Sequence, residues 1–277
     1  MLLYDPAMGV LVNNPDVIIT YILIWVVGLA VGSFLNVVIY RLPRGESINR
    51  PRSHCPHCKT PLHWYDNIPV ISYVFLMGKC RQCHERIAVR YPIVELTNPI
   101  LWMINYMLFG WSWYTLLISV VTTIFIIIAW IDIDEMLIPD CLNLILLVLS
   151  IIAIFVTVPE RAHDFAVSKW DHLFGLSIAV VFLTIRMIGL RFSKTEIIGC
   201  GDIKLIAVIG LLLGWQLTLL GIMFASFLAV LVELPLRFLK RKAKEDSLPF
   251  GPYLIFGFLL SLYYGSQIVH WYLSLIA

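Results

Sequence analysis

The chain has 277 residues, of which 60% are hydrophobic and only 14% carry a charge. That charged share is about half of what an ordinary soluble domain contains, and the mean hydropathy is +0.87. This composition excludes a soluble globular protein of this size and predicts an integral membrane protein. The net charge of +2 is too small to indicate a nucleic-acid partner, and none is expected.

Uncharged runs long enough to cross a bilayer recur along the chain. A spanning helix needs roughly 20 apolar residues, and residues 17–40 contain no charged residue. Residues 92–131 carry one charge and are long enough for two spans, with Gly110 at the turn between them. Residues 205–232 divide in the same way at Gly214-Trp215. The remaining predicted spans are 141–158, 170–189 and 248–277. The sequence therefore predicts an all-α polytopic membrane protein with about eight transmembrane helices.

Basic residues are distributed unevenly over the segments that join these spans. If the spans alternate, residues 41–91, 132–140, 186–204 and 237–247 lie on one side of the membrane. These segments hold 9, 0, 4 and 5 Lys or Arg residues, which makes 18 of the 20 in the chain. The positive-inside rule then predicts that the basic side is cytoplasmic and that both termini lie outside.

The longest hydrophilic segment, residues 41–91, contains two C-x-x-C pairs separated by 21 residues. Cysteines at this spacing bring four thiolates to one ion in a tetrahedral shell, which is typical of zinc. A cytoplasmic location keeps thiols reduced and favours a metal over disulfides. A redox pair and incidental cysteines are the alternatives. Because four thiolates leave no open coordination position, the predicted zinc is structural. The predicted ligands are Cys55, Cys58, Cys80 and Cys83.

Other histidines and cysteines are interpreted as ordinary structural residues. Cys141 and Cys200 lie at or near span ends and are expected to be small buried hydrophobic residues. Four histidines of the hydrophilic segment are possible substitute ligands, but each is interpreted first as a solvated or packing side chain. They are His54, His57, His63 and His84.

Two groups of acidic residues lie at the predicted cytoplasmic edge of the membrane. The first group follows Trp130. Three of its members, Asp134, Glu135 and Asp140, are interpreted as ordinary charges of a short turn at the membrane interface. If the helix continues through this group, Asp132 and Asp134 point about 200° apart and cannot both face one cavity. The second is Asp202, which follows two glycines and precedes an apolar run. Placing an ionisable group near lipid costs free energy unless the group is paired, hydrated or used in function. A close pair of carboxylates suits either acid–base catalysis on water or a proton relay.

Five segments in this order resemble the type IV prepilin leader peptidases, bifunctional inner-membrane enzymes of pilus and type II secretion systems. The segments are Gly32 to Pro43, the two C-x-x-C pairs, Arg90 to Glu95, Asp132 to Asp140 and Gly199 to Asp202. The resemblance implies a GxGD-type aspartic protease with Asp132 and Asp202 as its catalytic residues. Asp134 and Asp140 do not take the catalytic role in the family pattern.

The resemblance also implies a substrate, a cofactor and a location. Family members remove the short basic leader from prepilins or pseudopilins at the cytoplasmic face of the inner membrane. Many then methylate the new N-terminal amine with S-adenosylmethionine. The family associates methylation with its cysteine-bearing loop, so Lys79 and Glu95 are candidate cofactor-binding residues. From the residues alone, they are interpreted as a solvated lysine and a helix-start charge.

Three parts are then expected along the chain. Residues 1–40 form the outside N-terminus and first transmembrane helix, residues 41–91 the cytoplasmic zinc domain, and residues 92–277 a membrane-embedded peptidase domain with about seven helices.

Two other function classes stay open beside the protease with coupled N-methylation. One is a proton-coupled transporter that uses the same carboxylates, and the other is a zinc-stapled membrane scaffold without chemistry.

Overall fold

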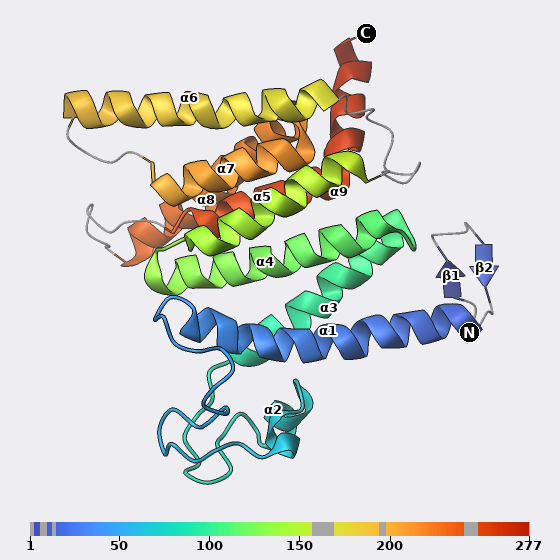
Figure 1. Cartoon of the computed structure of the whole chain (residues 1–277), viewed down its shortest axis with the longest axis vertical. Coiled ribbons are helices and arrows are strands. Elements are labelled where there is room, and N and C mark those ends of the chain that lie inside the picture. Colours follow the sequence, from blue (N-terminus) through green and yellow to red (C-terminus); the bar gives the residue numbers. More distant parts are fainter. Residues whose placement is uncertain are drawn as a thin grey trace. The chain divides into compact units, whose positions relative to one another are not determined.

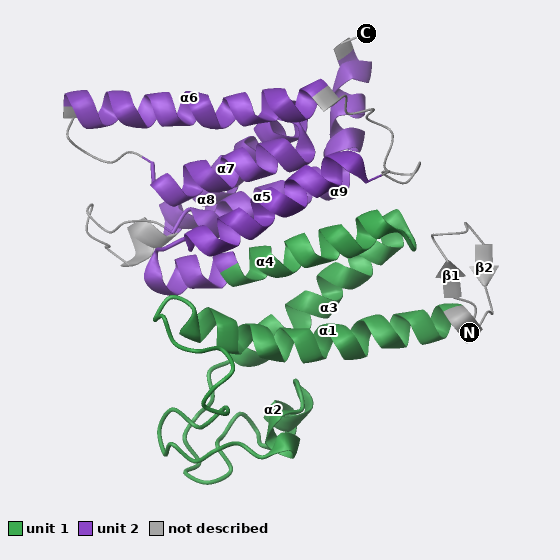
Figure 2. Cartoon of the chain, viewed as in Figure 1, with its two compact units in different colours: residues 1–127 green, residues 128–277 purple. Residues whose placement is uncertain are grey.

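The computed structural model describes residues 3–5, 10–12, 15–156, 169–193, 198–240 and 249–276. The chain divides into two compact units, residues 1–127 and residues 128–277 (Figure 2). The division falls inside helix α4 (Trp113–Glu135), so it differs from the three parts expected from the sequence. The three-part organisation stays a prediction.

The first unit contains a short antiparallel hairpin, two long helices and a cysteine-bearing loop between them (Figure 1). The loop, residues 42–89, is mostly irregular, and the helices on either side of it are the main packed pair of this unit. The unit also includes the first part of α4. Its other elements are β1 (Leu3–Asp5), β2 (Val10–Val12), α1 (Pro15–Arg41), η1 (Trp64–Asn67), α2 (Ile71–Phe75) and α3 (Arg90–Phe109).

The backbones of α1 and α3 approach closely because α1 presents glycines to its partner. A Cβ atom on Gly28 would lie 2.7 Å from the Cβ of Pro99, and one on Gly32 would lie 2.8 Å from the backbone of Glu95. The side chain of Asn98 fixes the crossing by donating a hydrogen bond to the Gly28 carbonyl at 2.9 Å. Small residues at the crossing are the usual means by which membrane helices pack.

The second unit is a bundle built from the end of α4 and five further helices (Figure 1). Two crossings again bring glycines together, Gly175 against Gly210 between α6 and α7, and Gly221 against Gly257 between α8 and α9. The hydroxyl of Ser150 on α5 donates to the Val208 carbonyl on α7 at 3.1 Å. The five helices are α5 (Asp140–Phe155), α6 (Lys169–Ser193), α7 (Cys200–Leu213), α8 (Trp215–Lys240) and α9 (Gly251–Ile276).

The predicted all-α membrane fold with a cysteine-bearing segment is confirmed, with the small hairpin as an addition. Each of the eight predicted spans coincides with one helix, and the turns at Gly110 and Gly214 fall where the sequence placed them. Within the described part of the chain, 5 helices are long and apolar enough to cross a membrane: α1, α4, α6, α8 and α9. Helices α3, α5 and α7 are not among them, so the count of eight crossings stays a prediction. The protein is a multi-pass membrane protein.

Candidate active site and metal centre

Asp132 lies in the last turn of α4 and points into the second unit. Its side chain is only 6% exposed. Its Oδ2 atom accepts a hydrogen bond of 2.9 Å from the backbone N–H of Gly251, the first residue of α9. The carboxylate therefore lies at a helix N-terminus, where the helix dipole and the unpaired N–H groups stabilise negative charge.

Asp202 lies in the first turn of α7 and is held in a similar way. Its carboxylate accepts a hydrogen bond from the backbone N–H of Gly199, the residue that caps the start of this helix. A side chain at the third helical position that reaches back to the cap is the arrangement of a capping box. The charge of Asp132 acts on Asp202, so the two carboxyl groups are close enough to interact electrostatically.

The first turn of α5 completes this arrangement of helix ends. A Cβ atom on Gly201 would lie 3.0 Å from the Cβ of Ile138, the residue two positions before α5 begins. The Lys204 ammonium of α7 forms a 2.6 Å ion pair with Asp140, the first residue of α5. The glycine thus lets the α5 and α7 N-termini pack against each other beside Asp202. This edge of the second unit gathers negative charge where three helices begin.

Two acidic residues of the first group, Asp134 and Glu135, lie outside this arrangement. Asp134 and Glu135 are exposed, whereas Asp132 is buried, because α4 continues to Glu135 and turns the two aspartates to opposite sides. Asp140 lies in the first turn of α5, as the sequence predicts for a charge that complements the helix dipole. The structure thus brings Asp132 and Asp202 together and separates Asp134 from them.

Gly251 is the residue of this site that the sequence analysis missed. A Cβ atom at this position would lie 2.7 Å from the Oδ2 atom of Asp132, so only glycine lets α9 begin against the carboxylate. The Gly251-Pro252 pair at the start of the last apolar run was the available signal, since glycine and proline mark the beginnings of helices. It does not, however, indicate which carboxylate the helix end would meet.

The four cysteines of the two C-x-x-C pairs form one cluster in the first unit. Their sulfur atoms all lie within 4.8 Å of one another, and the sulfurs of Cys55 and Cys83 are 3.8 Å apart. A tetrahedral zinc site with Zn–S bonds of about 2.3 Å places its sulfurs about 3.8 Å apart. The donor set therefore fits a four-thiolate metal ion. Among the described residues, no histidine belongs to this cluster.

The two pairs fold as matching turns. The N–H of Lys59 donates to the Cys55 carbonyl, and the N–H of His84 donates to the Cys80 carbonyl. Lys59 and His84 each follow the second cysteine of a pair, and both adopt the left-handed backbone conformation, with φ of 60° and 57°. Hydrogen bonds from Thr60 lower the pKa of the Cys58 thiol to about 6, which favours the thiolate that a metal binds.

Two expectations about single residues are wrong. Cys141 and Cys200 are exposed rather than buried, because each lies in the first turn of its helix, where fewer neighbouring side chains cover it. Glu95 is not a helix-start charge, since it lies in the second turn of α3 and is 9% exposed. Its Oε2 accepts a 2.7 Å hydrogen bond from the Val70 N–H, and the Ser33 hydroxyl also bonds to it. These contacts make Glu95 an anchor for the cysteine-bearing loop.

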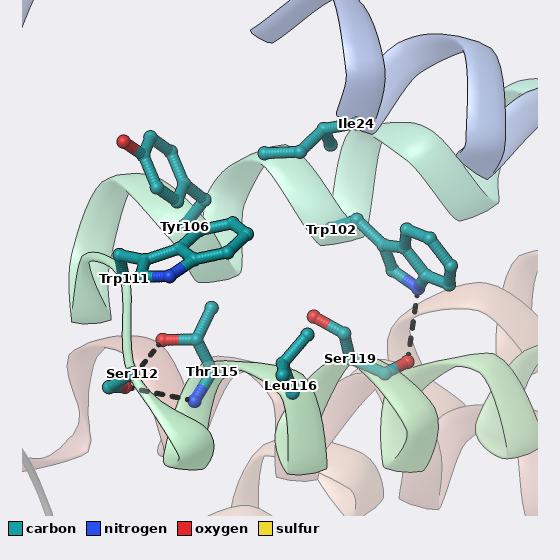
Figure 3. Close-up of a pocket in the computed structure, with 8 residues that line it drawn as sticks. All are labelled: Ile24, Trp102, Tyr106, Trp111, Ser112, Thr115, Leu116 and Ser119. Carbon is teal, nitrogen blue, oxygen red and sulfur yellow. Dashed lines mark hydrogen bonds between the residues drawn. The ribbon is translucent and has the colours of Figure 1, made fainter. Parts of the chain in front are cut away.

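A small cavity lies between α1, α3 and the start of α4, lined by aromatic, aliphatic and hydroxyl side chains (Figure 3). Its volume of about 50 Å³ is far below the roughly 300–1,000 Å³ of small-molecule sites. The indole N–H of Trp102 is already satisfied by the Ser119 carbonyl at 3.0 Å. This cavity therefore does not fit a methyl-donor cofactor. Its lining residues are Ile24, Trp102, Tyr106, Trp111, Ser112, Thr115, Leu116 and Ser119.

Comparisons with known proteins cover both units. The bacterial peptidase A24 N-terminal domain matches residues 26–109, and the type IV leader peptidase family matches residues 119–234. A curated prepilin leader peptidase/N-methyltransferase of Pseudomonas aeruginosa is 32% identical over 97% of this chain and 98% of its own length. Proteins of the same name from Aeromonas hydrophila and Neisseria gonorrhoeae are 32% and 34% identical, over 91% and 90% of this chain and 93% of each relative. No solved structure matches the chain. With this coverage and these two domains, the chain belongs to the prepilin leader peptidase/N-methyltransferase family.

Proposed function

We propose that the protein is a membrane-embedded aspartic endopeptidase that removes the leader from type IV prepilins or pseudopilins and methylates the new N-terminal residue. Asp132 and Asp202 are the proposed catalytic pair. The observation that carries this proposal is the placement of both carboxylates at helix N-termini in one electrostatically coupled site, in a chain of this family.

The proposed chemistry is the hydrolysis of one peptide bond by a shared acid–base pair. Two carboxylates held near each other cannot both ionise readily, so one keeps a proton while the other is charged. The charged group takes a proton from water as the water oxygen bonds to the peptide carbonyl carbon. The protonated group gives its proton to the nitrogen as the carbon–nitrogen bond breaks. The helix ends of α7 and α9 stabilise the carboxylate that carries the charge.

The location of the site supports cleavage at the cytoplasmic face of the inner membrane. The basic segments, with 18 of the 20 Lys and Arg residues, lie on the same side as Asp132 and Asp202 if the spans alternate. The cysteine-bearing domain then lies in the cytoplasm, and both termini lie in the periplasm. Substrates of pilus or type II secretion systems have an apolar N-terminal helix, which would lie in the bilayer with its scissile bond at this edge.

A metal ion and a methyl donor complete the proposal. Zinc is the proposed metal of Cys55, Cys58, Cys80 and Cys83, and its role is to hold the loop in one conformation. S-adenosylmethionine is the proposed methyl donor, which supplies an electrophilic methyl group to the new terminal amine. Lys79 is exposed and so accessible to such a cofactor. Glu95 is already bonded to Val70 and Ser33, so its carboxylate fits loop anchoring better than cofactor binding.

The test is mass spectrometry of a prepilin incubated with purified protein, zinc and S-adenosylmethionine. The wild-type protein should remove the leader and add one methyl group. Asp132→Asn and Asp202→Asn should each lower the cleavage rate by at least about 10²-fold, the typical contribution of a positioned acid or base. Asp134→Asn is the matched control because Asp134 is exposed two residues from Asp132; its rate should stay near wild type. Near-normal cleavage by either Asn variant of the proposed pair would overturn that assignment.

A further inference from the structure

The cysteine-bearing loop presents an apolar surface that the proposed chemistry does not use. Four side chains of α2 and the residues after it are largely exposed, and we name them the α2 apolar face. They are Ile71, Val74, Phe75 and Met77, with exposed fractions of 51%, 66%, 82% and 84%. An exposed cluster of large apolar side chains usually marks a contact with another protein or with a membrane.

The opposite side of α2 is fixed to the loop. The Tyr73 hydroxyl donates to the Ile87 carbonyl at 3.4 Å, and the Ser72 hydroxyl donates to the Ile68 carbonyl at 2.6 Å. Both side chains are only partly exposed. The short helix is therefore amphipathic, with its polar side held by the loop and the α2 apolar face directed away from it.

A hydrogen bond to α3 places the start of α2 beside the membrane helices rather than beyond their ends. Val70, which precedes α2, donates to Glu95 of α3. Glu95 lies about 7.5 Å along the axis from the first residue of α3, at 1.5 Å per residue. The backbone of Glu95 packs on Gly32 of α1, which is about 13.5 Å from the end of α1 at Arg41 by the same rise. Figure 1 agrees, since the loop doubles back and α2 lies within the length of α1.

Gly32, where α3 packs on α1, lies inside the apolar part of α1. Residues 17–40 contain no charged residue, and α1 is one of the helices long enough to span a bilayer. A segment hydrogen-bonded to Glu95, about 7.5 Å along α3 from its charged first residue Arg90, is therefore near the boundary between lipid headgroups and acyl chains when Arg90 lies at the membrane surface. Side chains exposed at that depth would face lipid rather than water.

We propose that the α2 apolar face inserts into the bilayer interface, so that the cysteine-bearing loop is held on the membrane as a monotopic anchor. Amphipathic segments bury such faces about 5–10 Å into this boundary. Lys79 and Arg86 are both exposed. Their backbones form an isolated antiparallel β-bridge, which begins two residues after Met77. Their positive charges are placed to meet anionic headgroups. The loop then holds its metal site against the membrane surface and not in free solution.

Site-directed photocrosslinking tests this proposal. The photoreactive residue p-benzoylphenylalanine is placed at Phe75 or Val74, and at Tyr73 as the matched control on the opposite side of α2. Each zinc-loaded protein is reconstituted in nanodiscs of phosphatidylethanolamine and phosphatidylglycerol, irradiated, digested and weighed by mass spectrometry. Phe75 and Val74 should give phospholipid adducts several-fold more often than Tyr73. Zinc content of each variant checks that the loop is folded.

Two results would overturn the proposal. One is a lipid adduct yield at Phe75 and Val74 no higher than at Tyr73, in protein with its full zinc content. The other is crosslinking of both positions to an added prepilin or to a second copy of the chain in place of lipid, which would make this face a protein contact. The experiment does not depend on cleavage, so it is independent of the roles assigned to Asp132 and Asp202.

Discussion

At the scale of single residues, the contact between Asp132 and Gly251 is the feature most sensitive to a small change. Valine at position 251 would place its Cβ only 2.7 Å from the Oδ2 atom of Asp132, too close for an ordinary contact, and would push the carboxylate out of position. Because a shift of about 1 Å in a catalytic group can cost about 10²-fold in rate, Gly251→Val should lower the cleavage rate by a similar factor. The measurement is the initial rate of leader removal by mass spectrometry.

The control for Gly251→Val is Phe256→Ala, an exposed position on the same helix. Its cleavage rate should stay near that of the wild type, and methylation of a pilin supplied without its leader should proceed in both variants. A Gly251→Val protein that cleaves at the wild-type rate would contradict the role of this helix end in positioning Asp132.

The residues of the site differ in how far the sequence could reveal them. The helical periodicity separates Asp132 from Asp134, and the structure buries only the first. The glycines around Asp202 indicate a close approach, which Ile138 makes. The Gly251 contact lies 119 positions from Asp132 in the chain, and nothing local to either residue encodes it. The exposure of Cys141 and Cys200 was also beyond reach, because hydropathy alone does not separate lipid-facing from buried positions.

At the scale of elements, the cysteine cluster should act as a unit with its metal. Cys80→Ser removes one thiolate, and a structural site that loses a ligand loses most of its affinity. We expect the variant to lose bound metal and to expose the loop to protease. Methylation should fall further than cleavage, because the two carboxylates lie in the other unit. Elemental analysis, which also distinguishes zinc from iron, and limited proteolysis are the measurements.

Cys141→Ser is the matched control for this change. Cys141 is an exposed cysteine outside the cluster, so metal content and both activities should be unchanged. Equal loss of cleavage and methylation in correctly inserted Cys80→Ser protein would refute the separation of roles between the loop and the carboxylate site.

The glycine crossings make a second prediction at this scale. Gly175 and Gly210 bring the backbones of α6 and α7 into direct contact, and no side chain fits between them. Overpacking of this kind typically costs about 1–3 kcal/mol, so Gly175→Val should lower the thermal unfolding midpoint by several degrees. Val180→Ala, an exposed position on α6, should change it little. The check is a thermal scan of the purified protein in detergent. An unchanged midpoint for Gly175→Val would contradict the role of this close backbone contact in stabilising the fold.

The elements themselves were largely predictable, but their packing was not. Long uncharged runs and the glycines at 110 and 214 define eight helices, because both signals are local. The contacts of α6 with α7 and of α8 with α9 depend on which small residues face each other, and membrane helices have no apolar preference for one partner over another. The short helix α2 escaped prediction because its apolar residues fall within a hydrophilic, basic segment.

At the scale of the whole molecule, two units correspond to two family matches, residues 26–109 within the first and most of residues 119–234 within the second. The cysteine cluster belongs to the first unit and the carboxylate site to the second. The candidate metal centre and the carboxylate site thus lie in separate compact units. The helix α4, which contains the boundary, joins them directly.

The number of membrane crossings decides where the two ends of the chain lie. Eight crossings put both termini on one side, whereas crossings by only the 5 helices that are long and apolar enough would put them on opposite sides. The distribution of Lys and Arg favours eight, because 18 of 20 then fall on one face. Alkaline phosphatase fused after Ala277 should therefore be active, since this enzyme folds only in the periplasm. A fusion after Arg50, in the cysteine-bearing loop, should be inactive. An inactive C-terminal fusion in a stably expressed protein would mean an odd number of crossings, and at least one of α3, α5 and α7 would then not cross the bilayer.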